Sequence, residues 1–389
     1  MKILFLTPRY PHVIDGGGLL KTKKLIDFFN INTNLTVVSL NTSITSIVKD
    51  ANVVEFPLCE LTYKPSFYNL LRSYFYRIPL SIVRNQSFEM VAELDKYLSW
   101  CDIVFVDHFI MFQYIPKDFS KRIYLHEHNA EFKIWERSSS NEKNLAKKIL
   151  LLLESVRVKY YERSICRKSH LVFASPNDRE ALVDIGVPEP LLRNTYHLGD
   201  DSMIEQPDII FSDSNKNLVF LGNLDWGPNL DGISWFLEDM WSTILDKHPD
   251  LVLNIVGKAS DESAKYLKCF KNVKVHGFVN DLNTVLSQAR VFIAPLRYGS
   301  GMKVKNITAL YRGIPLVTTS VGAEGIKLEN GVNSFIADDK CSFINRIFEL
   351  IESDDLCISL SNNARALAKK NYLWSANLDL MLQEMNVHD

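Results

Sequence analysis

The sequence has few of the residues that form metal, redox or membrane-spanning sites. Its six cysteines are scattered over 389 residues at no metal-ligand spacing, which is typical of reduced cysteines in a cytosolic protein. Apolar runs stay short of the ~20 residues of a membrane-spanning helix, and the N-terminal run is too short for a signal peptide. The 44 basic and 46 acidic residues do not indicate nucleic acid as a partner. We therefore expect a cytoplasmic globular protein.

Several catalytic motifs are also absent. The sequence has no P-loop, no G-x-S-x-G and no D-x-D, so it does not support a magnesium-bound diphosphate held by paired aspartates. The glycines at 16–18 lack the third glycine of the dinucleotide-binding motif, because Lys21 stands at that position. Histidines, cysteines and aspartates show no zinc-ligand spacing. The sequence therefore predicts neither a metal site nor a bound cofactor.

The chain is long enough for two domains. Apolar stretches that alternate with helical patterns predict strands in the first half at residues 2–7, 35–40, 53–57, 102–107, 122–128 and 171–174. The pattern stops in the polar stretch 200–217 and then begins again. This alternation predicts the fold class α/β, with two Rossmann-like domains facing each other across a cleft.

The expected domains follow from this interruption. They are an N-terminal domain over residues 1–200, a C-terminal domain over 201–372, and a terminal helix over 373–389 that packs back on the N-terminal domain.

The stretch 294–326 has the features of a phosphate site. Gly301 lies in a loop after an apolar run, and Lys303 and Lys305 stand where the next helix should begin. That helix should end at Gly313. Free backbone N–H groups, a helix N-terminus and nearby cations together favour a bound phosphate.

Other expected loops of the C-terminal domain also carry glycine. They span residues 222–232, 257–258 and 322–325, and a helix is expected at 233–245. Since parallel strands end at one edge of a sheet, these loops and Lys258 would meet a ligand in the cleft. A nucleotide diphosphate suits the three glycine loops that follow Leu221, Val256 and Pro295, whereas any one loop alone favours a simple tight turn.

Histidines mark the corresponding edge of the N-terminal domain. His126, Glu127 and His128 stand at the end of the expected strand 122–128, and His108 follows an earlier strand. A neutral histidine there could transfer a proton or hydrogen-bond a sugar. The alternative is a capping or buried structural histidine.

Two stretches of the sequence are basic. The first is also rich in aromatic residues, and the second is expected to contain a long helix. Residues 61–88 hold four cations, seven aromatic residues and no acid, and residues 133–168 hold ten Lys or Arg against four Glu. They indicate either solvated faces over buried apolar stripes or contact with an anionic membrane surface or a lipid-linked acceptor.

These motifs resemble those of retaining glycosyltransferases of the GT-B fold, family four, the "glycosyl transferases group 1" type. PLRYGSGMKVKNITALYRGIPLVTTSVGAEGI resembles the family's P-x-R-x-G-x-G-x-K-x-K-x-x-E-A-x-x-x-G-x-P-V-V-x-T-x-x-G-x-E-G. VFLGNLDWGPNLDGISWF is similar to a subgroup signature, F-x-G-x-x-x-W-x-P-N, and VHGFVNDL to G-x-V-x-D-L. The resemblance covers nearly the whole chain.

The resemblance implies metal-independent transfer from a nucleotide-sugar, which is a co-substrate and not a cofactor. It implies His128 and Lys303 as catalytic residues, and Gly17, Gly18 and His108 as acceptor-binding residues. The donor-binding residues that it implies are Gly222, Asn223, Lys258, Phe278, Val279, Arg297, Gly301, Lys303, Lys305, Thr308 and Glu324.

The sequence departs from the family pattern at two places. Ser300 and Thr308 replace two glutamates, of which the second normally hydrogen-bonds the nucleotide ribose. Asn223 and Asn229 stand where many members have Arg and Lys, a change that the W-x-P-N subgroup shares. Glu324 is either a substitute for the missing ribose ligand or a helix cap.

Three functions follow from the motifs. The first is a cytoplasmic transferase at the inner membrane face, moving a sugar from a UDP- or GDP-sugar to a polysaccharide or lipid-linked oligosaccharide. The second is a nucleotide-sugar-binding protein without catalysis, which the changes at 300 and 308 favour. The third is a UDP-sugar epimerase, which would need a carboxylate pair for acid–base chemistry.

Overall fold

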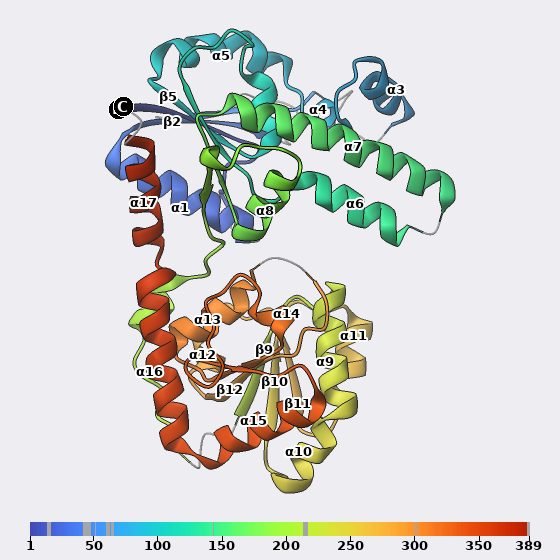
Figure 1. Ribbon diagram of the computed structural model, residues 1–389, viewed down its shortest axis with the longest axis vertical. Helices are drawn as coiled ribbons and strands as arrows, with labels where there is room; N and C mark the ends of the chain where they lie inside the picture. The colour runs from blue at the N-terminus through green and yellow to red at the C-terminus, as the bar shows by residue number, and fades with distance from the viewer. Residues whose placement is uncertain are drawn as a thin grey trace. The chain divides into compact units, whose positions relative to one another are not determined.

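The computed structural model divides the chain into two compact units (Figure 1). The first unit comprises Met1–His197 and Leu378–Asp389, and the second comprises Leu198–Asn377. The structure describes residues 1–13, 17–41, 48–50, 52–59, 63, 66–142, 144–212, 217–299 and 302–386. Each unit has its own sheet and its own buried apolar core.

The first unit is built on an eight-stranded sheet with the strand order β3-β4-β2-β1-β5-β6-β7-β8. All neighbouring strands are parallel except β3 and β4. The strands are β1 (Lys2–Thr7), β2 (Asn34–Asn41), β3 (Val48–Asp50), β4 (Val53–Pro57), β5 (Ile103–Asp107), β6 (Arg122–His126), β7 (Leu171–Ala174) and β8 (Leu192–Asn194). Because β1, β5 and β6 are parallel neighbours, their carboxyl ends lie at one edge of the sheet.

Helices cover both faces of this sheet (Figure 1). They are α1 (Gly17–Asn32), α3 (Phe67–Phe75), α4 (Leu80–Arg84), α5 (Phe88–Trp100), the 3₁₀ helix η1 (Phe109–Tyr114), α6 (Glu131–Asn141), α7 (Leu145–Lys168), α8 (Pro176–Asp184) and η2 (Glu189–Leu191). The end of α17 (Trp374–Asn386) also belongs to this unit, where the Tyr124 hydroxyl donates to the Met385 carbonyl at 2.9 Å. Arg193 Nε donates to Glu384 at 2.7 Å.

The second unit has a six-stranded parallel sheet with the order β11-β10-β9-β12-β13-β14. Its strands are β9 (Asn217–Leu221), β10 (Val252–Val256), β11 (Val273–Gly277), β12 (Ala289–Ala294), β13 (Leu316–Thr318) and β14 (Phe335–Ile336). Its helices are η3 (Asp201–Glu205), α9 (Gly227–Asp239), α10 (Trp241–Lys247), α11 (Asp261–Leu267), α12 (Asn283–Leu286), α13 (Val304–Arg312), α14 (Ser320–Ala323), α15 (Lys340–Glu352) and α16 (Asp354–Asn371).

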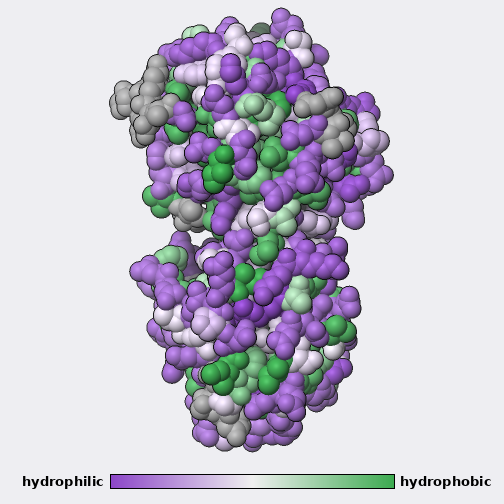
Figure 2. All heavy atoms as spheres, turned by 90° about the vertical axis from the view of Figure 1, so that its left-hand side faces the viewer, coloured by the Kyte–Doolittle hydropathy of each residue, from purple (hydrophilic) through white to green (hydrophobic). Residues whose placement is uncertain are grey.

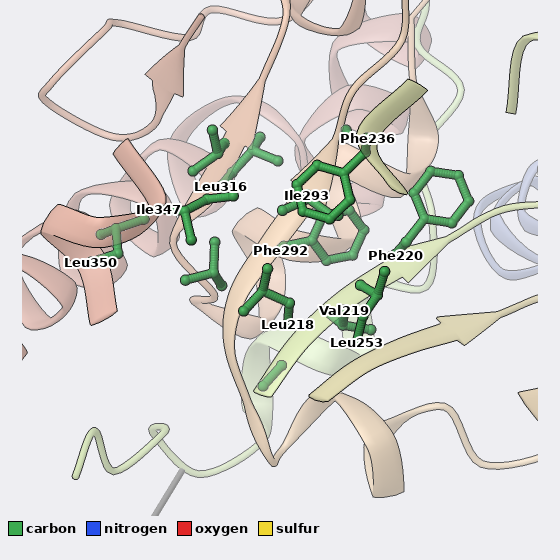
Figure 3. Close-up of a cluster of buried hydrophobic side chains, with 14 of the residues drawn as sticks. Leu218, Val219, Phe220, Phe236, Leu253, Phe292, Ile293, Leu316, Ile347 and Leu350 are labelled. Atoms are coloured by element: carbon green, nitrogen blue, oxygen red, sulfur yellow. The ribbon is translucent and has the colours of Figure 1, made fainter. Parts of the chain in front are cut away.

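Continuous apolar runs explain the central strands of this sheet. Parallel strands that are covered by helices on both faces need apolar residues at every position, not at alternate ones. All six residues of β12 are buried, and Phe292 and Ile293 pack among side chains from β9, α9, β13 and α15 (Figure 3). The prediction of an α/β protein with two Rossmann-like domains is confirmed.

Two local predictions for the second unit are wrong. The helix expected at 233–245 begins earlier, at Gly227, and breaks at Met240 into α9 and α10. Pro228 is tolerated in the first turn of α9, since the N–H that proline lacks would have no partner there. The loop expected at 322–325 contains the end of the short helix α14, where the Thr319 side chain caps the Gly322 N–H at 3.1 Å.

The surface of the described residues is largely polar on one face. On the face that carries α16 and α17, hydrophobic residues lie in small groups among hydrophilic ones (Figure 2). Among the helices of the described residues, none combines the length and the apolar character that crossing a bilayer requires.

Candidate functional site

Asp107, the last residue of β5, is the centre of a polar cluster in the first unit. Its Oδ1 accepts hydrogen bonds from His126 Nδ1 at 2.6 Å and from His128 Nε2 at 2.8 Å. Its Oδ2 accepts from the Thr7 and Thr22 hydroxyls at 3.0 and 2.7 Å. Burial opposes ionisation, but the two imidazoles outweigh it and hold the pKa of Asp107 well below its ordinary value. The cluster therefore contains a buried, fully hydrogen-bonded carboxylate.

This carboxylate fixes the tautomer of His128. Because Asp107 is ionised, it can only accept, so His128 Nε2 carries the proton. In the neutral imidazole the lone pair is then on Nδ1. A Cβ atom on Gly18 would lie 3.4 Å from that Nδ1, so the lone pair faces the first turn of α1.

A cavity of about 180 Å³ opens beside this lone pair. It brings together three residues predicted from the sequence, namely Gly18, His108 and His128. The other lining residues are Thr7, Pro8, Arg9, Leu19, Thr22 and Asp107. Gly17 is the first residue of α1, and no atom of the described residues lies within 4 Å of a Cβ added to it.

His108 has an unusual backbone. Its φ is 105°, a left-handed value that a residue with a side chain rarely adopts and that often marks a functional position. Its Nε2 lies 3.5 Å from Glu131 Oε1, and its ring centre 5.4 Å from that of His128. Burial, and then the charge of His128, lower the pKa of His108 to about 3, so the imidazole is neutral.

Lys21 is buried beneath the cluster. Its ammonium has no hydrogen-bond partner among the described residues. Burial lowers the pKa of Lys21 to about 7, against the opposing charges of Asp107 and Asp178. Sequence reasoning used Lys21 only as a residue that breaks a glycine motif, and it missed Asp107 altogether. The available signal for Asp107 was its place at a strand end, next to His108.

Among the described residues, one group of side chains has the types and spacing that could hold a metal ion. It consists of Asp107, His126 and His128. Their facing atoms are already joined by hydrogen bonds, and each imidazole proton would have to leave before a cation could bind. The Asp107 oxygens also accept from two hydroxyls. The arrangement is thus explained without a metal, and the prediction of no metal site stays a prediction.

Lys305 is the centre of a second group, in the second unit. Its Nζ donates to Asn229 Oδ1 at 2.6 Å and lies 4.4 Å from the centre of the Phe220 ring. Asn229 Nδ2 in turn donates to the Asn223 carbonyl at 2.8 Å. A Cβ on Gly222 would lie 2.6 Å from Asn229 Nδ2, so a side chain at position 222 would displace Asn229. The structure therefore groups the predicted residues Gly222, Asn223 and Lys305 through Asn229.

Lys303 adds a second cation to this group. It is the N-cap residue of α13, its side chain is buried, and its Nζ lies 3.5 Å from Glu324 Oε2. Burial, and then the charge of Lys303, lower the pKa of Lys305 to about 7. A bound anion would stabilise the charge of Lys305, which burial and Lys303 disfavour, beside the N-terminus of α13.

The remaining predicted donor-binding residues differ in their partners and in their exposure. Arg297 is held by Asp231, with Nε–Oδ2 and Nη2–Oδ1 distances of 2.9 and 2.5 Å. The Lys258 side chain is 75% exposed. Phe278, directly after β11, is 82% exposed, whereas Val279 packs partly against the core. Gly301, like Ser300, lies outside the described residues.

Thr308 lies on α13 with its hydroxyl turned to the main chain. Oγ1 donates to the Val304 carbonyl at 3.2 Å, and Thr308 is buried. A Cβ on Gly199 would lie 3.1 Å from that Oγ1, so the space beside Thr308 is filled by the Gly199 backbone. The glutamate that the family pattern has at this position has no evident room here.

Part of the second unit matches a known protein family. Residues 215–353 match the family "Glycosyl transferases group 1". The chain is 25% identical over 269 residues to an uncharacterized 44.6 kDa protein in the cps region of Klebsiella pneumoniae. That alignment covers 65% of this chain and 66% of the relative. The family that residues 215–353 match is the one that the resemblance named.

Solved structures extend the comparison over the whole chain. HepE from Anabaena, in complex with UDP, is similar at 100% coverage of both chains, with 16% identity and a TM-score of 0.65. Sucrose-phosphate synthase from Thermosynechococcus elongatus is similar over 99% of this chain and 98% of that one, with 14% identity and a TM-score of 0.68. At these identities the likeness shows the fold, which is the GT-B fold of two Rossmann-like domains.

Proposed function

We propose that the protein is a metal-independent, retaining glycosyltransferase. It would move a sugar from a UDP- or GDP-sugar to a polysaccharide or lipid-linked oligosaccharide. The observation that carries the proposal is the pairing of Lys303 and Lys305 beside the start of α13, within the stretch that matches the glycosyl transferases group 1 family. HepE, which has the same fold, is known in complex with UDP-glucose.

The second unit would hold the nucleotide diphosphate. Lys303 and Lys305 would face its negative charge, which grows as the bond to the sugar breaks. Asn229 keeps the Lys305 ammonium in position, since it accepts from Nζ and is itself anchored to Asn223. Phe278 and Val279, at the end of β11, would lie against the base. The ribose would be held by a group other than Thr308, for which we propose Glu324.

The first unit would hold a sugar hydroxyl. His128 Nδ1 is an acceptor that faces the cavity, and it would accept from that hydroxyl. Gly18 leaves the approach to Nδ1 open because it has no side chain. In this proposal His128 orients the sugar while Asp107 holds the imidazole, and the anomeric configuration of the product, read by NMR, tests retention.

The first unit would also contact an anionic membrane surface at the cytoplasmic side. On α3, Phe67 and Phe75 are 73% and 81% exposed, next to Arg72. Further large apolar side chains are exposed on α7, namely Leu145, Ile149, Leu150, Leu152, Leu153, Val156 and Tyr160. Exposed apolar helix faces with basic residues beside them are typical of membrane-surface contacts.

A non-catalytic binder is the second candidate, and one observation favours it. Thr308 is buried against Gly199, so the ribose ligand of the family pattern is absent. An epimerase is less well supported. Among the described residues that line the 180 Å³ cavity, Asp107 is the one carboxylate, and its oxygens are occupied by four donors.

The variant Lys303→Ala separates transfer from binding. A panel of UDP-, GDP- and ADP-sugars is first ranked by thermal shift, because a bound ligand raises the melting temperature. With the best donor, we expect Lys303→Ala to lower the rate of transfer about 100- to 1,000-fold. Lys271→Ala, at an exposed lysine of the same unit, is the control. Unchanged transfer in Lys303→Ala would refute the phosphate assignment. If the wild-type protein transfers no sugar and Lys303→Ala binds the donor more weakly, the result would favour the non-catalytic binder.

A further inference from the structure

The backbone that follows His128 is held by residues of other helices. We refer to residues 128–132, which follow β6 and include the first residues of α6, as the His128 turn. Glu162, on α7, accepts from the N–H groups of Glu131 and Phe132 at 2.8 Å each, one with each carboxyl oxygen. This cap fixes the start of α6 against α7, whereas a cap from the helix's own N-cap residue would only begin the helix.

The earlier part of the His128 turn is held in the same way. Ala130, the N-cap residue of α6, cannot cap the helix with its side chain, and its N–H donates to Asp178 of α8 at 2.8 Å. The His128 carbonyl accepts from His197 Nε2 at 3.2 Å. Since Asp107 binds the imidazole, both the backbone and the ring of His128 are fixed.

Holding the turn with Glu162 costs stability. Glu162 is fully buried near Glu127, whose two carboxyl oxygens accept no hydrogen bond among the described residues. Burial raises the pKa of both acids, and the two N–H donors oppose this in Glu162, so they favour its ionisation over that of Glu127. A serine at the N-cap and an apolar residue on α7 would begin α6 without a buried carboxylate. Buried acids of this kind are frequent where a site needs a fixed geometry.

The helix α7 carries a second buried glutamate, which caps a different helix. Glu154 accepts from the N–H of Leu80, the first residue of α4, and from Arg157 Nη1 at 2.7 Å. Like Glu162, it is less than 5% exposed. No residue of α4 is among the described residues that line the 180 Å³ cavity beside His128. The two glutamates therefore make the same kind of contact from the same helix, but only the cap of Glu162 lies beside a candidate site.

From this contrast we propose that Glu162 and Asp178 are positioning residues for sugar transfer. Neither is among the described residues that line the 180 Å³ cavity, so they act through the His128 turn. By fixing its backbone, they keep the lone pair of His128 Nδ1 directed at the sugar hydroxyl. This inference rests on the proposed function, because it assigns further residues to the same site.

The variant Glu162→Gln tests the proposal without any transfer reaction. Its amide oxygen can accept from one N–H, but its NH₂ group cannot accept from the other. The loosened turn should weaken the bond from His128 Nε2 to Asp107, so ¹⁵N NMR of the full chain should show Nδ1 of His128 partly protonated. His126, on β6 and bonded to the same carboxylate, should keep its signals. Unchanged His128 signals, or an equal change in both histidines, would overturn the proposal.

Transfer kinetics then show whether this positioning matters for the reaction. We expect Glu162→Gln to lower kcat about tenfold or more, because a small misplacement of a contact group slows a reaction strongly. Its affinity for UDP should change less than about twofold, since the second unit would hold the diphosphate. Asp178→Ala should lower kcat to a similar degree, whereas Asp178→Asn should stay within about threefold, because its amide oxygen can still accept from the Ala130 N–H.

Glu154→Gln is the matched control for these variants. It removes a buried cap from the same helix, and we expect kcat within about twofold of the wild-type value at a temperature where melting curves show both glutamine variants to be folded. An equal loss of kcat in Glu154→Gln and Glu162→Gln would overturn the proposal, since it would show a general effect on the fold. If the wild-type protein transfers no sugar, the proposed function fails, while the ¹⁵N result still decides whether Glu162 positions His128.

Discussion

The two polar groups of this protein are organised in opposite ways. In the first unit, a carboxylate is surrounded by donors, and both oxygens of Asp107 are occupied. In the second unit, burial and the neighbouring charge of Lys303 disfavour the charge of Lys305, while Lys305 donates to Asn229 and Lys303 lies 3.5 Å from Glu324. The first group is electrostatically complete, and the second is stabilised further by an added anion.

The difference shows what each group can contribute to a reaction. A completed network fixes the orientation and tautomer of one acceptor, His128 Nδ1, which suits the recognition of a hydroxyl. A buried cation whose charge is disfavoured by a second cation suits the stabilisation of a charge that develops on a ligand. Variants that remove one feature from either group should therefore fail in distinguishable ways.

Asp107→Asn should have the largest effect. The amide oxygen could still accept from the imidazoles while the NH₂ group donates to the Thr7 or Thr22 hydroxyl, but the negative charge is lost. Without that charge the proton is no longer held on His128 Nε2, and part of the molecules should carry it on Nδ1 and lose the lone pair in the cavity. We expect sugar transfer to fall about 100-fold or more, in line with the loss of a positioned polar contact. ¹⁵N NMR of the histidines should show the changed tautomer.

Thr22→Val provides the control for that variant. It removes one donor to Asp107 Oδ2 but keeps both imidazole contacts, so transfer should fall less than about tenfold, as for one neutral hydrogen bond. A large loss in Asp107→Asn with an unchanged His128 tautomer would show that the carboxylate acts in another way.

The positions of these residues at the carboxyl ends of the strands could be predicted from the sequence, but the hydrogen bonds between their side chains could not. Apolar runs predict the strands, and parallel strands bring the ends of β1, β5 and β6 together. This placed His108 and His128 near Gly18. The sequence does not show that Asp107 accepts from both histidines, because side-chain direction at a strand end depends on packing.

In the second unit, too, the structure differs from the sequence prediction where side-chain contacts depend on packing. The loop at Gly222 was predicted, but the contact of Asn229 with Lys305 depends on α9 beginning at Gly227, six residues earlier than expected. Thr308 was predicted as a donor ligand by its place in a motif, whereas its hydroxyl bonds the Val304 carbonyl next to Gly199. A motif gives the residue and the helix, not the neighbour that fills the space beside it.

Lys305→Met tests whether the cation pair responds to an anion. The pKa of Lys305 is about 7 and a bound diphosphate would raise it, so UDP binding should take up a proton above about pH 7. UDP affinity of the wild-type protein should then fall as the pH rises from about 7 to 9, and this lysine should add no pH dependence below that range. In Lys305→Met we expect about 10- to 100-fold weaker binding at pH 6.5 and loss of this pH component.

Uridine, which lacks phosphate, supplies the comparison for Lys305. Its affinity should change little between the wild-type protein and Lys305→Met, as measured by titration calorimetry. A similar loss for uridine and UDP would mean that the variant disturbs the loop at Asn223, and not the diphosphate contact.

Lys21→Met should have the smallest effect, and in the opposite direction. Lys21 is buried without a hydrogen-bond partner in the described residues, and its pKa of about 7 lies below that of an unfolded lysine. The unfolded chain therefore binds more protons between about pH 7 and 10.5, so the stability of the wild-type first unit rises with pH across this range. Methionine removes the cost of burying the charge, and we expect it to stabilise the unit by about 1–2 kcal/mol at pH 7 and to abolish this slope. Lys23→Met, in the same helix but on its surface beside Asp27, should neither stabilise the unit nor change the dependence of its stability on pH. Urea unfolding at pH 7 and 9 measures both effects. Destabilisation by Lys21→Met would instead mean that the ammonium has a favourable partner in the folded protein, and that the completed network of the first unit includes this lysine.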